Sequence, residues 1–208
     1  MQRFDSIHRS AQTSGDVSHL KGLYQLMVEA LDVQKAFEDW DMRSRGGDES
    51  SQLYTPRPAT RSERSEIDNL ESVYPISFSF PTWDAASACI SYAMSRIYLN
   101  SLLIAIQNAI HHLNISSDMV DTKHLTRSAI ACADWICQSI EWFFEDHKRM
   151  IGRMVVLAPF EAARGLFAQL CEGGTDDPEL DASLKLKARF CKGVTQRIKD
   201  GGLPILEG

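Results

Sequence analysis

Apolar residues recur with helical spacing along most of the chain. The first such segment runs from about Val17 to Trp40. The longest runs from Pro81 or Thr82 to His112 and is apolar nearly all round, which is typical of a central helix covered by neighbours. Its main apolar positions are Ile90, Met94, Ile97, Tyr98, Leu102, Leu103, Ile106 and Ile110.

Capping residues predict where two further helices begin. Asp121-Thr122 is a suitable cap for a helix that continues to about Asp146. Asp177-Pro178 predicts the start of the last helix, because proline is favoured at the first helical position, and Gly201-Gly202 is expected to end it. The buried lines predicted for these two helices are Leu125, Ala129, Cys132, Ile136, Ile140 and Phe143, and then Leu180, Leu184, Cys191, Val194 and Ile198.

The most hydrophobic run, Met150–Phe167, contains helix-breaking residues. Proline inside a helix removes a backbone hydrogen bond and clashes with the preceding turn, at a cost of roughly 3 kcal/mol. We therefore expect a buried helix that stops before Pro159, a bend at that residue, and a second helix over Phe160–Cys171. Gly152 and Gly165 are expected to allow the close approach of neighbouring helices.

Two segments lack a helical period. Asp41–Glu66 is polar and contains glycines and prolines, so we expect a flexible connection. Tyr74–Pro81 is bounded by prolines and is expected to form an extended strip on the core. No segment alternates convincingly as a strand, and the predicted class is all-α: an irregular multi-helix bundle with a Pro-kinked buried helix and one long polar loop. The predicted organisation is a flexible N-terminus over 1–16, a helix over 17–40, a flexible linker over 41–66 and a helical domain over 67–208.

Composition narrows the class of protein. The chain has 208 residues, of which 44% are hydrophobic, which suits one globular domain with a sizeable core. A net charge of -6 argues against a broad basic surface, so no direct DNA binding by this chain is expected. The N-terminus shows no secretory signal, and polar residues interrupt the apolar stretches, which argues against a membrane span.

The cysteine pattern fits reduced thiols in a nuclear or cytoplasmic protein. The five cysteines are odd in number, widely spaced and surrounded by apolar residues. No CxxC pair is present, which excludes a zinc cluster within this chain. Cys137 lies near Asp134 and Glu141 in sequence, and these carboxylates are expected to raise the pKa of its thiol rather than to activate it.

A broken polar line along the long central helix is the best candidate for a binding site. Arg96, Asn100, Gln107 and His111 follow one another at helical spacing in an otherwise apolar segment. Buried polar groups need partners, so this line either meets solvent or lines a pocket. For His111, which is followed by a second histidine, a helix-end pair is the plainer interpretation, because a helix C-terminus favours imidazolium.

Two tryptophans of the next helix complete the set of candidate pocket residues. Trp135 and Trp142 lie two turns apart beside the apolar seam, where aromatic pairs more often belong to the core than to a ligand-binding wall. The residues that we predict to line a pocket are Arg96, Asn100, Gln107, His111, Trp135 and Trp142.

Other chemical interpretations are weaker. Asp134, Glu141 and Glu145 share one helical face and invite an acid–base reading, but a solvated polar stripe is the better interpretation. Asp121 and His124 have the carboxylate-x-x-His spacing of a helical metal site without the second copy that such sites need. We expect no metal and no cofactor, and neither a phosphate-binding loop nor a serine elbow occurs.

Four segments resemble a known family. They are FPTWDAASACISYAMSRIYLNSLLI, ACADWICQSIEWFF, IGRMVVLAPFEAARGLF and RFCKGVTQRIKDGGLPI. Their order and spacing, from about Phe78 onward, resemble the C-terminal part of the fungal-specific transcription factor domain. That domain is the all-helical regulatory region found downstream of binuclear zinc-cluster DNA-binding domains. The six-cysteine zinc cluster itself is missing from this sequence.

The resemblance implies a transcription-factor-like regulatory protein without its own DNA-binding domain, with residues 67–208 as the regulatory-type domain. Such a protein would act through a protein partner or an apolar small molecule in the regulation of secondary metabolism. It would be nuclear or cytoplasmic, and a homodimer is compatible with it. The alternative is a small secondary-metabolite enzyme, a cofactor-independent cyclase or isomerase that uses the cavity of the same fold. A fragment of a larger regulator is a third interpretation.

Overall fold

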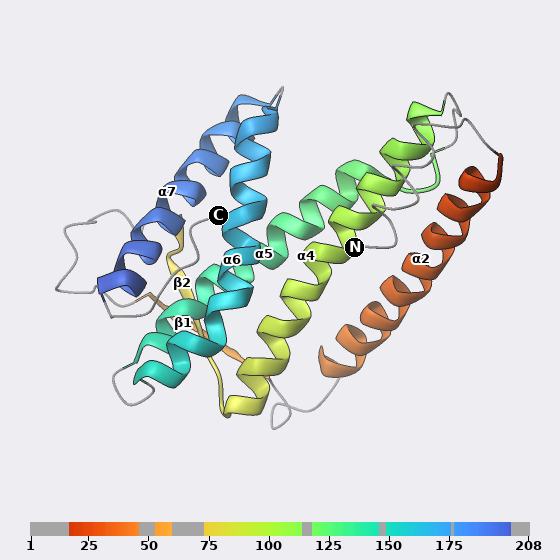
Figure 1. Cartoon of the computed structure of the whole chain (residues 1–208). Helices are drawn as coiled ribbons and strands as arrows, with labels where there is room; N and C mark the ends of the chain where they lie inside the picture. The colour runs from red at the N-terminus through yellow and green to blue at the C-terminus, as the bar shows by residue number, and fades with distance from the viewer. Residues whose placement is uncertain are drawn as a thin grey trace. The chain divides into compact units, whose positions relative to one another are not determined.

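The computed structural model describes residues 17–45, 53–59, 73–113, 118–145, 149–175 and 177–200. In this part of the chain the fold is all-α, as predicted, and it also contains one small two-stranded sheet that was not predicted. The elements are α2 (Val17–Arg45), β1 (Thr55–Pro58), β2 (Ile76–Ser79), α4 (Trp83–His112), α5 (Thr122–Phe144), α6 (Arg149–Gly173) and α7 (Pro178–Asp200) (Figure 1). The predicted N-terminal segment 1–16 and Gly201-Gly202 lie outside the described residues.

The chain divides into two compact units, and α4 and α5 each contribute to both. Unit 1 contains α2, the part of α4 from Ser95 onward, and α5 up to Ala129. Unit 2 contains both strands, the first part of α4 up to Met94, the part of α5 from Ile130 onward, and helices α6 and α7.

Unit 1 is built around an apolar contact between α2 and α4. The residues of α2 that take part follow helical spacing, so one face of this helix is buried, as the sequence predicts. The buried core consists of Leu23, Met27, Ala30, Leu99, Leu103, Ile106, Ala109, Ile110 and Leu125. The helix ends at Arg45, later than the predicted end at Trp40.

Unit 2 contains an antiparallel pair of strands, of which the sequence predicted one. β2 confirms the extended strip, whereas β1 lies inside the segment predicted to be a flexible connection. The register pairs Thr55 with Ser79 and Pro58 with Ile76. Ala59 N donates to Pro75 O at 3.0 Å. Odd-numbered amides of β1 therefore face β2, and its two prolines fall where no amide is needed.

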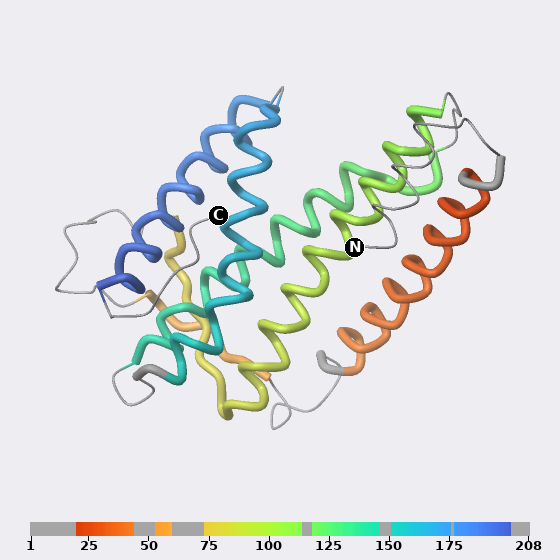
Figure 2. The backbone as a smooth tube through the Cα atoms, viewed as in Figure 1, coloured from red at the N-terminus to blue at the C-terminus, as the bar shows by residue number. Residues whose placement is uncertain are grey.

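Helix α6 corrects the expected interruption at proline. It runs as one helix from Arg149 to Gly173 with Pro159 inside it, and Figure 2 shows the same uninterrupted coil. Burial of Phe160 and Phe167 on this helix offsets the lost backbone bond. The expected close approach of a neighbouring helix at Gly165 is wrong: a Cβ placed there meets nothing within 4 Å.

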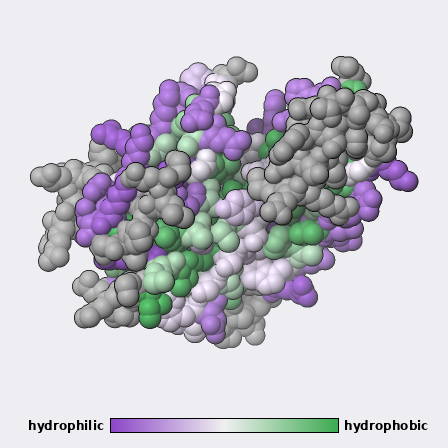
Figure 3. All heavy atoms as spheres, in the orientation of Figure 1, coloured by the Kyte–Doolittle hydropathy of each residue, from purple (hydrophilic) through white to green (hydrophobic). Residues whose placement is uncertain are grey.

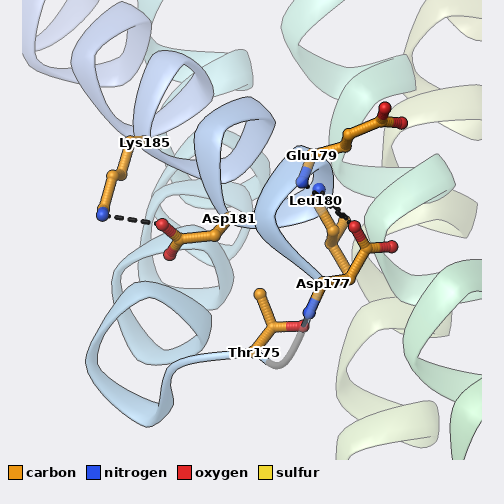
Figure 4. A network of polar contacts seen from close by, with 6 residues as sticks. All are labelled: Thr175, Asp177, Glu179, Leu180, Asp181 and Lys185. Atoms are coloured by element: carbon orange, nitrogen blue, oxygen red, sulfur yellow. Dashed lines mark hydrogen bonds and ion pairs between the residues drawn. The ribbon is translucent and has the colours of Figure 1, made fainter.

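Both predicted helix caps are present. Asp177 Oδ1 accepts hydrogen bonds from the amides of Glu179 at 3.0 Å and Leu180 at 3.2 Å (Figure 4). Asp121 Oδ1 accepts from the amide of His124 at 3.0 Å, and this bond holds the pKa of Asp121 below its ordinary value. Each carboxylate satisfies amide groups that the first helical turn cannot pair internally.

Candidate functional site

The polar line predicted on α4 lies wholly within unit 1. Arg96 is 7% exposed, and the side chains of Asn100 and Gln107 are fully buried. His111, one turn beyond Gln107, is exposed. Three of the four residues are thus buried polar groups. The four residues form two pairs with different surroundings: Gln107 with His111, and Arg96 with Asn100.

Gln107 and His111, at the end of α4, have polar partners within the chain. Gln107 Oε1 accepts from the amide of Met119 at 3.0 Å, and its Nε2 lies 2.8 Å from His111 Nε2. His111 Nε2 also lies 3.0 Å from Asp118 Oδ1. These contacts tie the segment that precedes α5 to the last turns of α4. The buried side chain of Gln107 therefore has partners from neighbouring segments, and its burial needs no bound ligand.

The other pair belongs to a group of polar side chains from three helices. Arg96 Nη2 donates to Ser128 Oγ of α5 at 3.3 Å, and Arg96 Nη1 lies 3.8 Å from Glu38 Oε1 of α2. The same Glu38 oxygen accepts from Gln34 Nε2 at 2.9 Å. Asn100 follows Arg96 by one turn of α4. We call these residues the polar cluster of unit 1: Gln34, Glu38, Arg96, Asn100 and Ser128.

Several atoms of this cluster are buried without a hydrogen-bond partner among the residues that the structure describes. They are Gln34 Oε1, Arg96 Nε and Nη1, and both amide atoms of Asn100. A buried polar atom left unpaired costs about 1–3 kcal/mol. Unit 1 therefore leaves hydrogen-bonding capacity unused at this cluster, and a bound polar group that pairs with these atoms would recover the cost of burying them.

Sequence reasoning found Arg96 and Asn100 but missed the residues opposite them. Gln34 and Glu38 follow the buried Ala30 of α2 in steps of four, but Gln34 is half-buried and Glu38 is exposed. That spacing was visible, but polar residues after an apolar stripe normally signal solvent exposure. The contact with α4 became apparent only from the fold.

The two tryptophans belong to aromatic groups of unit 2. Around Trp135, in edge-to-face or tilted contact, lie Tyr54, Phe78 and Tyr92, with ring centroids at 5.2, 6.4 and 6.1 Å. Around Trp142 lie Phe80, Trp83 and Phe143, at 5.3, 5.2 and 5.0 Å. Such geometry is favoured by the ring quadrupoles. Trp142 is buried and belongs to the core, whereas Trp135 is half-buried and its indole Nε1 has no hydrogen-bond partner among the described residues.

The carboxylate row of Asp134 and Glu141 on α5, and Glu145 just after its end, is not the solvated stripe that the sequence favours. Each carboxylate is half-buried and pairs with a cation from α7 or β1. The pairs are Asp134 with Lys187 at 2.7 Å, Glu141 with Arg197 at 2.6 Å, and Glu145 with Arg57 at 2.8 Å. This face of α5 is a docking face, because the cations arrive from elements that lie far away in the sequence.

Asp134 joins three elements of unit 2. Its Oδ1 accepts from the Tyr74 hydroxyl at 2.7 Å, and its Oδ2 accepts from Lys187 Nζ at 2.7 Å. Burial, with added effects from the neighbouring Cys137 thiol and from Asp134, raises the pKa of Tyr74. The phenol is therefore held protonated as a hydrogen-bond donor, a structural role rather than that of a base.

A pair of buried thiols lies one turn further along α5 and α7. Burial raises the pKa of the Cys137 thiol, and a hydrogen bond with Cys191 adds to the effect. The carboxylate effect expected from sequence is present for Asp134 but is smaller. A protonated, buried thiol is a poor nucleophile, so this pair packs rather than reacts.

Comparison with known proteins leaves the family open. No family model matches this chain, and no curated protein and no solved structure matches it either. The resemblance to the fungal-specific transcription factor domain therefore stays a prediction. Within the described ranges, no group of three histidine, cysteine or acidic side chains is arranged to hold a metal ion.

Two of the helices that the structure describes are long and apolar enough to cross a membrane by length and composition alone. They are Trp83–His112 and Ile151–Gly173. Core helices of soluble proteins meet the same criterion, and half of the most apolar stretch of the first is buried inside the structure. On the face shown in Figure 3, hydrophobic residues lie at the surface among hydrophilic ones. The expectation of no membrane span stays a prediction.

Proposed function

We propose that this chain is a regulatory protein that responds to a small molecule bound at the polar cluster of unit 1. The proposal retains the role implied by the resemblance: a helical effector region that acts through a bound molecule and a partner protein. Regulation of secondary metabolism and a nuclear or cytoplasmic location belong to the same proposal.

One observation supports the ligand: Arg96 and Asn100 are buried on α4 with polar atoms that the described chain leaves unpaired. Buried polar groups in native proteins are nearly always paired with protein, water or ligand. A molecule that pairs with them recovers the cost of their desolvation. It also stabilises the packing of α2 against α4, because these two helices supply most of the cluster.

The test is ligand-dependent thermal stability. Purified protein would be melted in the presence of a library of small polar and apolar compounds, alongside two variants. Asn100→Leu removes the buried amide, whereas Asn108→Leu makes the same change at an exposed position of α4. The proposal expects compounds that raise the melting temperature of the wild type and of Asn108→Leu but not of Asn100→Leu.

The regulatory part has its own readout. A compound that passes the first test should change protection from hydrogen exchange along α2 and α4, and should alter the affinity of the protein for a transcriptional regulator. Conversion of that compound into a new product would instead favour the cyclase or isomerase alternative. A library without a single Asn100-dependent binder would remove the support for a ligand at this cluster.

A further inference from the structure

We infer that the molecule bound at the polar cluster of unit 1 is a small carboxylate that replaces Glu38 as the counter-ion of Arg96. The inference rests on the proposed function and specifies the chemistry of its ligand. It follows from the charges, distances and exposure of the residues around Arg96.

The guanidinium of Arg96 is under-compensated in this structure. Among the described residues, its polar contacts are a long hydrogen bond of 3.3 Å to Ser128 and the Glu38 carboxylate at 3.8 Å. A buried cation is tolerated when it is both neutralised and hydrogen-bonded. Charge-assisted bonds from guanidinium to carboxylate normally span about 2.7–2.9 Å. Glu38 supplies a charge, but at this distance it supplies no hydrogen bond.

Glu38 is well placed to leave. Its side chain is 52% exposed, whereas that of Arg96 is 9% exposed. Glu38 can therefore turn toward water at little cost, but Arg96 cannot. A carboxylate that enters the cluster would accept hydrogen bonds from Arg96 Nε and Nη1, the two donors that have none here, and would keep the site neutral.

The charge of the cluster selects a monoanion. Arg96 is the one cation that the described contacts place in this group, and a phosphate dianion would leave excess negative charge in a buried site. Asn100 adds an amide donor, and the unpaired oxygens of Asn100 and Gln34 need a donor in return. A carboxylate that carries a hydroxyl group meets these requirements.

Four small probes test this chemistry. Glycolate and acetate carry the carboxylate, and glycolamide and acetamide are their uncharged counterparts. Each would be titrated at constant ionic strength, with binding followed by thermal melting and by amide chemical shifts of α2 and α4. We expect glycolate to bind more tightly than acetate, and both amides to bind at least tenfold more weakly than their acids.

The variants give a result that a merely structural cluster would not. Glu38→Gln should raise the affinity for glycolate several-fold, because it removes the competing carboxylate. Asp32→Asn, an equal charge change at an exposed position of the same helix, should leave the affinity unchanged. Arg96→Gln should abolish binding, and Arg127→Gln at an exposed position of α5 should not. If Arg96→Gln does not fold, the comparison of glycolate affinity between Glu38→Gln and Asp32→Asn still tests the inference.

The outcomes separate this inference from the proposed function. Equal binding of acids and amides, or a Glu38→Gln variant with unchanged or weaker glycolate affinity, would overturn the carboxylate inference. If uncharged library compounds nevertheless bind in an Asn100-dependent manner, the proposed function survives without it. If neither the probes nor the library bind at the cluster and only ordered water occupies it, both fail.

Discussion

The hydroxyl of Tyr74 donates a 2.7 Å hydrogen bond to the carboxylate of Asp134, sixty residues further along the chain. The second oxygen of that carboxylate accepts from Lys187 on α7. A single side chain of α5 thus holds the segment that leads into β2 on one side and the last helix on the other. Since both partners are polar and poorly exposed, loss of the carboxylate leaves two unsatisfied groups instead of one.

Asp134→Ala should therefore destabilise the protein by about 1–3 kcal/mol. This is less than the loss expected when a fully buried ion pair is broken, because the pair of Asp134 and Lys187 is partly exposed to solvent. Urea unfolding followed by circular dichroism measures the change. Glu172→Ala, at an exposed position near the end of α6, is the control and should change the stability by less than about 0.5 kcal/mol. Equal effects of the two substitutions would show that the bridge contributes nothing of its own.

The raised pKa of Tyr74 predicts a loss of stability at alkaline pH. Its unfolded pKa is about 10, and the folded state favours the protonated phenol. The unfolded chain therefore releases the proton first as pH rises, and stability falls above about pH 10. Below that pH the contribution is fully present.

Tyr74→Phe isolates this effect from other tyrosines. At neutral pH the variant should lose about 1 kcal/mol with the hydrogen bond. Its stability should then fall less steeply than that of the wild type between about pH 9 and 11. Urea midpoints measured across this range give both slopes. Parallel slopes would mean that the phenol ionises as readily in the folded protein as in the unfolded chain.

The features predicted well from sequence are local ones. The caps at Asp121 and Asp177 were predicted from the residue types that satisfy the first amides of a helix, and the apolar pattern of α4 predicted a long helix that ends at His112, as observed. Neither inference needs knowledge of which elements become neighbours. The extended strip at β2 belongs to the same group, because prolines restrict the backbone beside them.

The features predicted wrongly depend on distant partners. Periodicity places Asp134 and Glu141 on one face but cannot reveal that α7 brings Lys187 and Arg197 to meet it. β1 was missed for the same reason, because its two prolines are compatible with a strand only in the register in which β2 needs no amide from them. At the candidate site, the sequence places Arg96, Asn100 and Gln107 on one polar line of α4, and the structure shows that all three side chains are buried. Glu38 was missed because its contact with Arg96 is tertiary.

Asn100→Leu should stabilise the protein in the absence of ligand. Leucine has the same number and branching of side-chain heavy atoms and needs no hydrogen bond, so the cost of the unpaired amide disappears. The expected gain is about 1–2 kcal/mol in the free energy of unfolding. Chemical denaturation measures it, with Asn108→Leu as the exposed control. Destabilisation by Asn100→Leu alone would indicate that ordered water already satisfies the amide.

Pro159→Ala tests how α6 accommodates its proline. Alanine restores the missing amide donor and removes the ring clash, a gain of up to about 3 kcal/mol, while it gives up apolar contacts of a buried ring worth roughly 1–2 kcal/mol. Since α6 is already continuous through this position, its backbone needs little rearrangement, and we expect a net gain of about 1 kcal/mol. Urea unfolding would measure this gain, with Ala158→Ser at the exposed neighbouring position as the control. A loss of stability in Pro159→Ala would show that the packing of the buried ring outweighs the backbone hydrogen bond that proline removes.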